Sequence, residues 1–146
     1  MQSLAVSAIM IGLIFFWTMA GYESSSLDQR RAEAIAANFV VYRNAVHRHV
    51  FAHKTAGSVS LAELNLPQGF SAMAWQNQTV LVGGQLHCYV FGPASIETIA
   101  AVRRLLRGSA TIGWNNNGQL VRSGQGLALP NFIADREIVS VIVVDG

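Results

Sequence analysis

The chain opens with a long apolar run, and shorter apolar segments then alternate with polar turns. Residues 1–22 contain no Asp, Glu, Lys, Arg or His. As a helix, this run is about 30 Å long, which matches the hydrocarbon core of a bilayer. A small soluble domain cannot cover a helix that is apolar on every side. We therefore expect residues 1–22 to form a transmembrane anchor.

A cleaved signal peptide is the alternative interpretation of this run. Its start carries no Lys or Arg, and the run is longer than the apolar core of an ordinary signal peptide. However, Thr18-Met19-Ala20 is a tolerable cleavage site. The orientation also has two interpretations. Arg30 and Arg31 favour a cytoplasmic domain by the positive-inside rule, whereas a very short N-terminal tail easily stays inside while the C-terminal domain is exported.

An amphipathic helical pattern follows the apolar run. Ser26 is placed to N-cap a helix that we expect over residues 27–54. Val40 and Phe51 lie off its apolar stripe, and we interpret them either as a contact with a partner helix or as incidental surface apolarity. Glu23 either marks the water boundary or engages a neighbouring subunit. The stripe recurs at three- and four-residue spacing and consists of Ala32, Ile35, Phe39, Tyr42, Val46 and Val50.

The rest of the chain reads as two hairpins, a short helix and a final strand. Gly83-Gly84 suits the tight turn of a hairpin within residues 72–91, and a second hairpin is expected over residues 110–121. Residues 127–134 contain a proline and predict an irregular connection. The β-branched run 138–144 predicts the central strand. Between the hairpins, Ser95 caps a helix that ends at Gly108 and whose apolar positions are Ile96, Ile99, Ala100, Leu105 and Leu106.

This order predicts an α+β fold: a transmembrane helix, then a long amphipathic helix packed on an antiparallel sheet, with one further short helix. The layout is pilin-like. We expect residues 1–22 to be the anchor and residues 23–146 to be a single domain, because about 124 residues suffice for one core and not for two.

Composition and motifs favour contact rather than chemistry. The net charge is +2, and the basic residues do not form a dense patch, so we expect no nucleic-acid binding. The single cysteine, Cys88, excludes an intramolecular disulfide and a cysteine-based zinc cluster, and its setting predicts a buried strand residue. His49 and His53 share one helix face, which we interpret as cover for the end of the core rather than as a metal site. We find no nucleophile elbow, phosphate loop or metal-binding helix motif, so we expect no enzyme, no cofactor and no small-molecule substrate.

The layout and several segments resemble a known family. Residues 60–70, SLAELNLPQGF, the strands around Gly83-Gly84, and Gly113-Trp114-Asn115 before Gly118 are similar to the PilM family encoded with type IVB (thin) pilus genes. The resemblance covers essentially the whole chain. It implies a single-pass inner-membrane component of the pilus assembly apparatus or basal body, with a periplasmic domain that contacts other assembly proteins or pilins and a possible link to conjugation.

A minor pilin or pseudopilin-like filament subunit is the alternative function. Type IV pilins also join an apolar N-terminal helix to an antiparallel sheet. Their processing site needs a basic leader and a Glu early in the apolar helix, and this chain has no Glu before Glu23. We therefore expect an assembly component, with Val40, Phe51 and Glu23 as candidate partner-binding residues.

Overall fold

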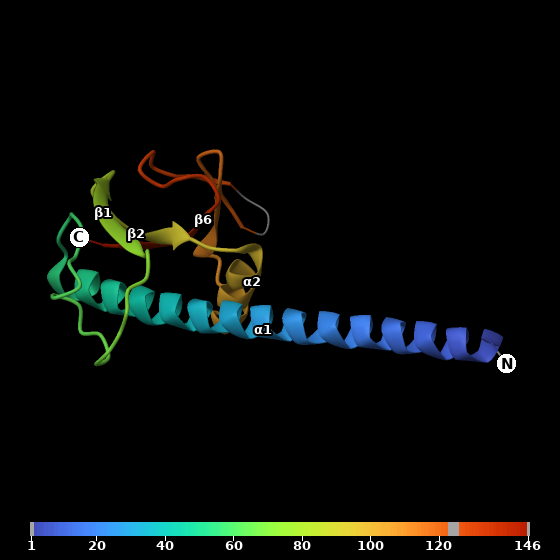
Figure 1. Cartoon of the computed structure of the whole chain (residues 1–146). Helices are drawn as coiled ribbons and strands as arrows, with labels where there is room; N and C mark the ends of the chain where they lie inside the picture. The colour runs from blue at the N-terminus through green and yellow to red at the C-terminus, as the bar shows by residue number, and fades with distance from the viewer. Residues whose placement is uncertain (1, 123–125, 146) are drawn as a thin grey trace.

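A long helix crosses one face of a six-stranded antiparallel sheet in the described part of the chain (Figure 1). The computed structural model describes the backbone of residues 2–122 and 126–145, and the side chains of residues 26–122 and 126–145. The predicted α+β class is confirmed. The elements are α1 Gln2–His53, β1 Gln76–Val82, β2 Gln85–Pro93, α2 Ile96–Leu105, β3 Ile112–Asn116, β4 Gln119–Val121, β5 Leu127–Ala128 and β6 Glu137–Val144.

Helix α1 is continuous, so the prediction that Ser26 caps a new helix is wrong. Ser26 lies inside α1, which runs from Gln2 to His53 without a break. Serine costs only a few tenths of a kcal/mol relative to alanine in a helix interior, and propagation of an existing helix is cooperative. No Gly or Pro lies between residues 22 and 53, and α1 ends where Lys54 adopts a positive φ of 50°.

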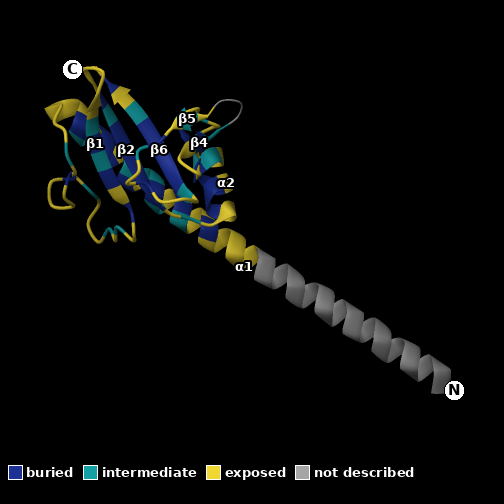
Figure 2. Ribbon diagram, turned by 90° about the horizontal axis from the view of Figure 1, so that it is seen from above, coloured by how far each residue is buried: buried dark blue, intermediate teal, exposed yellow. Residues whose placement is uncertain are grey.

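The predicted anchor, residues 1–22, lies outside the residues whose side chains are described. Among the described residues, no helix is both long and apolar enough to cross a membrane. Residues 26–31 of α1 are all exposed, and Ala32 is the first buried residue in the part of α1 whose side chains are described (Figure 2). The helix therefore leaves the body of the domain just before Ala32.

The sheet order is β1-β2-β6-β3-β4-β5, which places the last strand of the chain in the interior of the sheet as predicted. Strands β2 and β3 both pair antiparallel with β6, and α2 connects them. Both predicted hairpin turns are confirmed: Gly83 and Gly84 have φ of 58° and 87°, and Asn117 and Gly118 have φ of 51° and 81°. These positive φ values match the type I′ turns that join strands of normal twist.

Two strand predictions need correction. Strand β2 does not stop before Gly92, because Gly92 and Pro93 continue the register with β6. Residues 127–134 are not wholly irregular, because Leu127 and Ala128 form β5 against β4. The N–H of Leu129 then donates to the carbonyl of Gly118 at 2.8 Å, which holds this short edge strand before the proline ends it.

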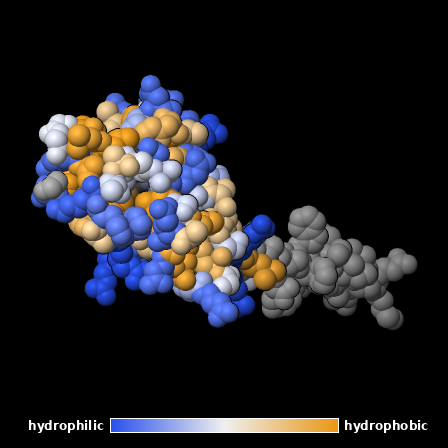
Figure 3. Space-filling model, turned by 90° about the vertical axis from the view of Figure 1, so that its left-hand side faces the viewer, coloured by the Kyte–Doolittle hydropathy of each residue, from blue (hydrophilic) through white to orange (hydrophobic). Residues whose placement is uncertain are grey.

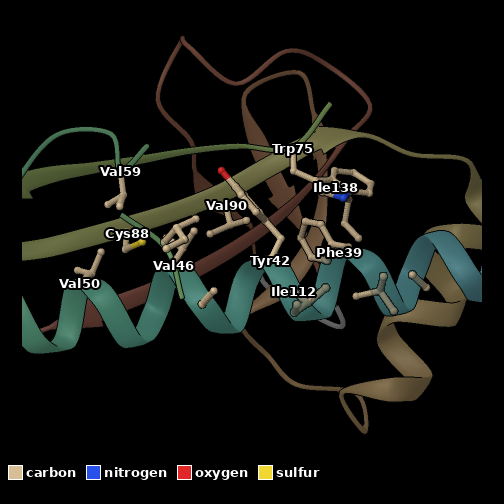
Figure 4. Close-up of a cluster of buried hydrophobic side chains, with 14 of the residues drawn as sticks. Phe39, Tyr42, Val46, Val50, Val59, Trp75, Cys88, Val90, Ile112 and Ile138 are labelled. Carbon is tan, nitrogen blue, oxygen red and sulfur yellow. The ribbon is translucent and has the colours of Figure 1, made fainter. Parts of the chain in front are cut away.

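The main core lies between α1, α2 and the sheet. Phe39, Val46 and Val50 are 0% exposed, which confirms the predicted stripe. Figure 4 shows these side chains pointing from α1 toward Val90 and Ile138 of the sheet. The ring of Phe39 meets that of Trp75 edge to face, with centroids 5.0 Å apart, a favoured aromatic geometry. Removing such a ring from a packed core costs about 3–5 kcal/mol.

The opposite face of the sheet carries a second apolar cluster. Alternate residues of β2 and β6, including Tyr89 and Val139, point away from the helices and pack under the segment that holds Leu129 and Ile133. Because both faces of β6 are covered, this strand has few polar side chains. Cys88 is 0% exposed and faces the main core, as its strand setting predicted.

The apolar positions of α2 differ from those expected. Ile96, Ala100 and Leu105 are exposed, and the buried face consists of Thr98, Ile99, Ala101 and Val102. The N-cap is confirmed, since Ser95 Oγ accepts from the N–H of Thr98 at 3.2 Å. Packing against α1 selects this face, and a single short helix contains too few turns to reveal it by periodicity.

Candidate partner-binding surface

The three residues predicted to bind partners have three different placements. Phe51 is 54% exposed near the end of α1. Val40 is half-buried and packs against the main core, so it has less surface to offer a partner. The side chain of Glu23 lies outside the described residues. The structure therefore brings none of these three together, and Phe51 is the predicted residue that lies open on the surface.

Phe51 lines a groove of about 640 Å³ on the side of α1 that faces away from the sheet. We name this the α1 groove. Its second wall is the segment after α1, which returns across the helix before entering β1 (Figure 1). The segment is held by Ser60 and Glu63, whose carboxylate accepts from the Ser60 N–H at 2.9 Å. The residues that line the groove are Val41, Asn44, His47, Arg48, Phe51, Asn65, Leu66 and Pro67.

Beside the groove, Arg43 reaches from α1 to the central strand. Its Nε donates to Ser140 Oγ at 2.7 Å, its Nη1 to Asn44 Oδ1 at 3.0 Å, and its Nη2 to Thr111 Oγ1 at 3.4 Å. Every one of these acceptors is neutral. Burial lowers the pKa of Arg43, although an arginine remains charged at any physiological pH. This network orients Asn44 at the edge of the groove.

His47 is the buried histidine of the helix, at 8% exposure. Burial, helped by the charge of Arg43, lowers the pKa of His47 from 6.5 to about 3, so the ring is neutral at physiological pH. Its Nε2 is buried without a hydrogen-bond partner among the described residues. The positive charge of the groove lining therefore comes from Arg48 alone.

The pair His49 and His53 shows the ring packing that its spacing predicted. The two rings stack with centroids 4.1 Å apart, and His53 Nδ1 lies 2.9 Å from the carbonyl of His49. Within the described residues, no group of three or more His, Cys, Asp or Glu side chains is placed to hold a metal ion. The prediction of no metal site stays a prediction for the chain as a whole.

A second hollow, of about 1170 Å³, lies where α1 meets α2. Its lining mixes both signs of charge: Asp28 and Glu97 lie there with Arg31 and Arg104. Arg104 pairs with Glu33 at 3.7 Å, between side chains that are both about half exposed or more. Such a pair contributes little to stability. This hollow shows no uncompensated charge and no preference for one kind of partner.

Sequence reasoning missed the α1 groove and the burial of Arg43. A signal for Arg43 existed, because it lies four residues after Phe39 and three before Val46, on the buried stripe. The groove had no such signal. Its second wall comes from Leu66 and Pro67, and their approach to α1 depends on the path of a loop.

The surface also carries scattered apolar residues. On the face shown in Figure 3, hydrophobic side chains form patches among hydrophilic ones. Leu81 and Val82 near the tip of the first hairpin are 65% and 48% exposed, and Val143 at the end of β6 is 46% exposed. Scattered apolar residues are normal on a protein surface and carry no function by themselves.

Comparisons with known proteins agree on one family. The PilM family model matches residues 6–141. The fold is similar to the crystal structure of a PilM protein from Escherichia coli B7A, with a TM-score of 0.58 and 20% sequence identity, over 79% of this chain and 94% of that chain. At this identity the likeness shows a shared fold. No curated protein matches the chain.

Proposed function

This chain belongs to the PilM family of pilus-related proteins, and from that premise we propose that it is a bitopic inner-membrane component of a type IVB pilus assembly apparatus. Residues 1–22 anchor it, and residues 23–146 form a periplasmic domain. It acts through contacts with other assembly proteins or pilins during pilus biogenesis, and through the pilus it contributes to conjugation. It has no turnover of its own and binds neither cofactor nor nucleic acid.

The continuous helix α1 is the observation that best supports this proposal. A helix of 52 residues is about 78 Å long, far longer than the domain needs to cover its sheet. Among the residues of α1 whose side chains are described, the buried ones begin at Ala32, and the charge-free run occupies the first part of the helix. One rigid element thus joins the apolar segment to the domain, as expected of a protein that holds a domain at a fixed height above a bilayer.

Protease accessibility in spheroplasts, combined with the intact mass of the membrane-extracted protein, tests the topology. We expect the full-length mass and digestion of the domain from outside. A mass that lacks about 20 N-terminal residues identifies a cleaved signal peptide and contradicts the anchor. Protection in intact spheroplasts places the domain in the cytoplasm and contradicts the periplasmic location.

A minor pilin is the second candidate, and the packing of one long N-terminal helix on an antiparallel sheet favours it. Fractionation separates the two. An assembly component stays with the inner membrane when pili are sheared off, whereas a filament subunit copurifies with the sheared pili. We expect the protein in the membrane fraction.

A further inference from the structure

Arg48, which lines the α1 groove, and Arg43, which lies beside it, have no carboxylate partner among the described residues. The ion pairs among the described residues are Arg104 with Glu33 and Arg136 with Asp135, and neither involves Arg43 or Arg48. Arg43 is half-buried and bonded only to neutral oxygens, and Arg48 is exposed in the groove lining. The groove lining contains no Asp or Glu. The lining of the α1 groove therefore carries one positive charge, that of Arg48, and no carboxylate.

An unpaired charge in a partly buried place is costly, because the protein replaces only part of its hydration. Arg43 recovers some of this cost through its three hydrogen bonds, but a guanidinium has five N–H donors, so two are left over. Burial of the rest of the groove under a partner strengthens every interaction with these charges, since the local dielectric falls. A partner that carries a carboxylate gains from both arginines.

Four of the eight residues that line the α1 groove are apolar. Val41 and Phe51 are 38% and 54% exposed on the helix side, and Leu66 and Pro67 face them from the returning segment. The other four lining residues are polar, and the volume of about 640 Å³ lies in the usual range of binding sites. It is large enough for several side chains of an extended or helical segment.

We propose that the α1 groove binds a peptide segment of a partner protein in which an Asp or Glu lies beside large aliphatic or aromatic residues. The carboxylate is held by Arg48, within the positive field of Arg43, and the apolar side chains lie against Phe51 and Leu66. Asn44 and Asn65 supply hydrogen bonds to the partner's backbone. This inference rests on the proposed function, in which the protein acts by binding other pilus proteins, and it specifies the chemistry of the segment that is bound.

Charge argues against a second copy of this chain as the occupant. A two-fold contact places each surface patch against itself. Such a contact through the groove brings Arg48 of one copy toward Arg48 of the other, with no acid in the lining to relieve the repulsion. An acidic segment of another protein has no such penalty.

The test uses the full chain in nanodiscs and a phage-displayed library of random dodecapeptides, with empty nanodiscs as the counter-selection. We expect the selected peptides to combine Asp or Glu with Leu, Ile or Phe. Synthetic copies are then titrated by fluorescence anisotropy. We expect Arg48→Glu and Phe51→Asp each to raise the Kd of the peptide by about tenfold or more. Replacing the acidic residue of the peptide by Asn has the same effect.

Leu81→Asp is the matched control, because Leu81 is as exposed as Phe51 but lies on β1, away from the groove. It leaves the Kd unchanged. When the library is selected for binding to the Arg48→Glu variant, we expect the selected peptides to be enriched in Lys or Arg. The thermal unfolding midpoints of all variants are compared first, and surface positions such as these are expected to leave them unchanged.

Three results overturn the inference. The selected peptides show no enrichment in Asp or Glu, or Arg48→Glu and Phe51→Asp leave peptide binding unchanged. The third is that the chain forms a dimer that dissociates in the Phe51→Asp variant. The measurement needs no pili and no defined topology. If the peptide test fails, the proposed role in pilus biogenesis is unaffected. If the topology test fails, the peptide titrations still decide whether the groove binds an acidic segment.

Discussion

Burial of the His47 imidazole ties the stability of the domain to pH. The folded state holds its pKa at about 3, whereas the unfolded chain has the ordinary value of 6.5. Below pH 6.5 the His47 imidazole is therefore protonated in the unfolded state but stays neutral in the folded state. The stability contributed by the neutral ring is present above pH 6.5 and is lost as the pH falls toward 3, by roughly 1.4 kcal/mol per pH unit.

We predict that the free energy of unfolding falls between pH 6.5 and pH 5 and that His47→Leu removes this slope. Leucine fills a similar space and eliminates the unpaired Nε2, so the variant is also more stable at pH 7 by about 1 kcal/mol. Urea unfolding of the detergent-solubilised chain at several pH values measures both effects. The prediction fails if His47→Leu keeps the slope of the parent chain.

Val40 and Phe51 differ in what a charged substitution does. Val40 is half-buried against the main core, so Val40→Asp places a partly desolvated carboxylate there and lowers the stability by about 1–3 kcal/mol. Phe51 is exposed, so Phe51→Asp leaves the fold intact. A loss of pili in Val40→Asp is therefore uninformative about partner contact, and Phe51 is the residue to change.

We predict that Phe51→Asp reduces pilus assembly while the protein accumulates at the parental level, and that Leu81→Asp does not. Counting pili by electron microscopy, with immunoblots of the membrane fraction, measures both quantities. Normal piliation in Phe51→Asp contradicts a role for the α1 groove in assembly.

At the scale of the elements, the continuity of α1 matters most. The polar residues after Glu23 suggested a break, and the helix passes through them because no Gly or Pro interrupts its backbone hydrogen bonds. Residues 26–31 are exposed, so helical hydrogen bonds contribute more to holding this stretch than packing on the body does. Its stiffness is thus open to test without disturbing the core.

We predict that Ser26→Pro bends α1 and that Ser26→Ala does not. Spin labels on Thr18→Cys and Arg48→Cys are about 45 Å apart in a straight helix. Buried Cys88 stays unlabelled. Double electron–electron resonance in nanodiscs measures the distance, which we expect to shorten and broaden only with proline. A broad distribution already present with Ser26 contradicts a continuous helix.

At the scale of the whole molecule, β6 joins the two hairpins of the sheet, which do not pair with each other. The hairpin of β1 and β2 pairs with one edge of β6, and the hairpin of β3 and β4 pairs with the other. Both apolar clusters include residues of β6: Ile138 belongs to the cluster under the helices and Val139 to the opposite one. The domain therefore cannot complete its sheet until the C-terminal residues are available.

We predict that deletion of residues 137–146 abolishes cooperative unfolding, whereas the substitution Asp145→Asn does not. The deletion separates the hairpins and exposes both clusters, and Asp145 only accepts a hydrogen bond from Gln85 near the chain end. Circular dichroism during thermal unfolding measures the difference. A cooperative transition in the truncated chain shows that β6 is not the centre of the fold.

Local signals in the sequence account for much of the fold. The spacing of Phe39, Val46 and Val50 identified the buried face of α1, because a helix repeats every 3.6 residues whatever it packs on. The glycine pair at the first hairpin identified its turn, because only such residues adopt two consecutive positive φ values without strain. Thus the buried face of α1, the hairpins, the interior position of β6 and the family resemblance were all available from the chain alone.

The tertiary structure alone decided what the surface offers. The Arg43 contact with Ser140 spans 97 residues, and the α1 groove exists because Leu66 and Pro67 return to the helix. It also decided that His47, rather than His49 or His53, is buried, and which face of α2 packs inward. Local periodicity states which residues share a face, but which faces meet depends on contacts between distant segments, whose free energies come from packing and desolvation in the assembled domain.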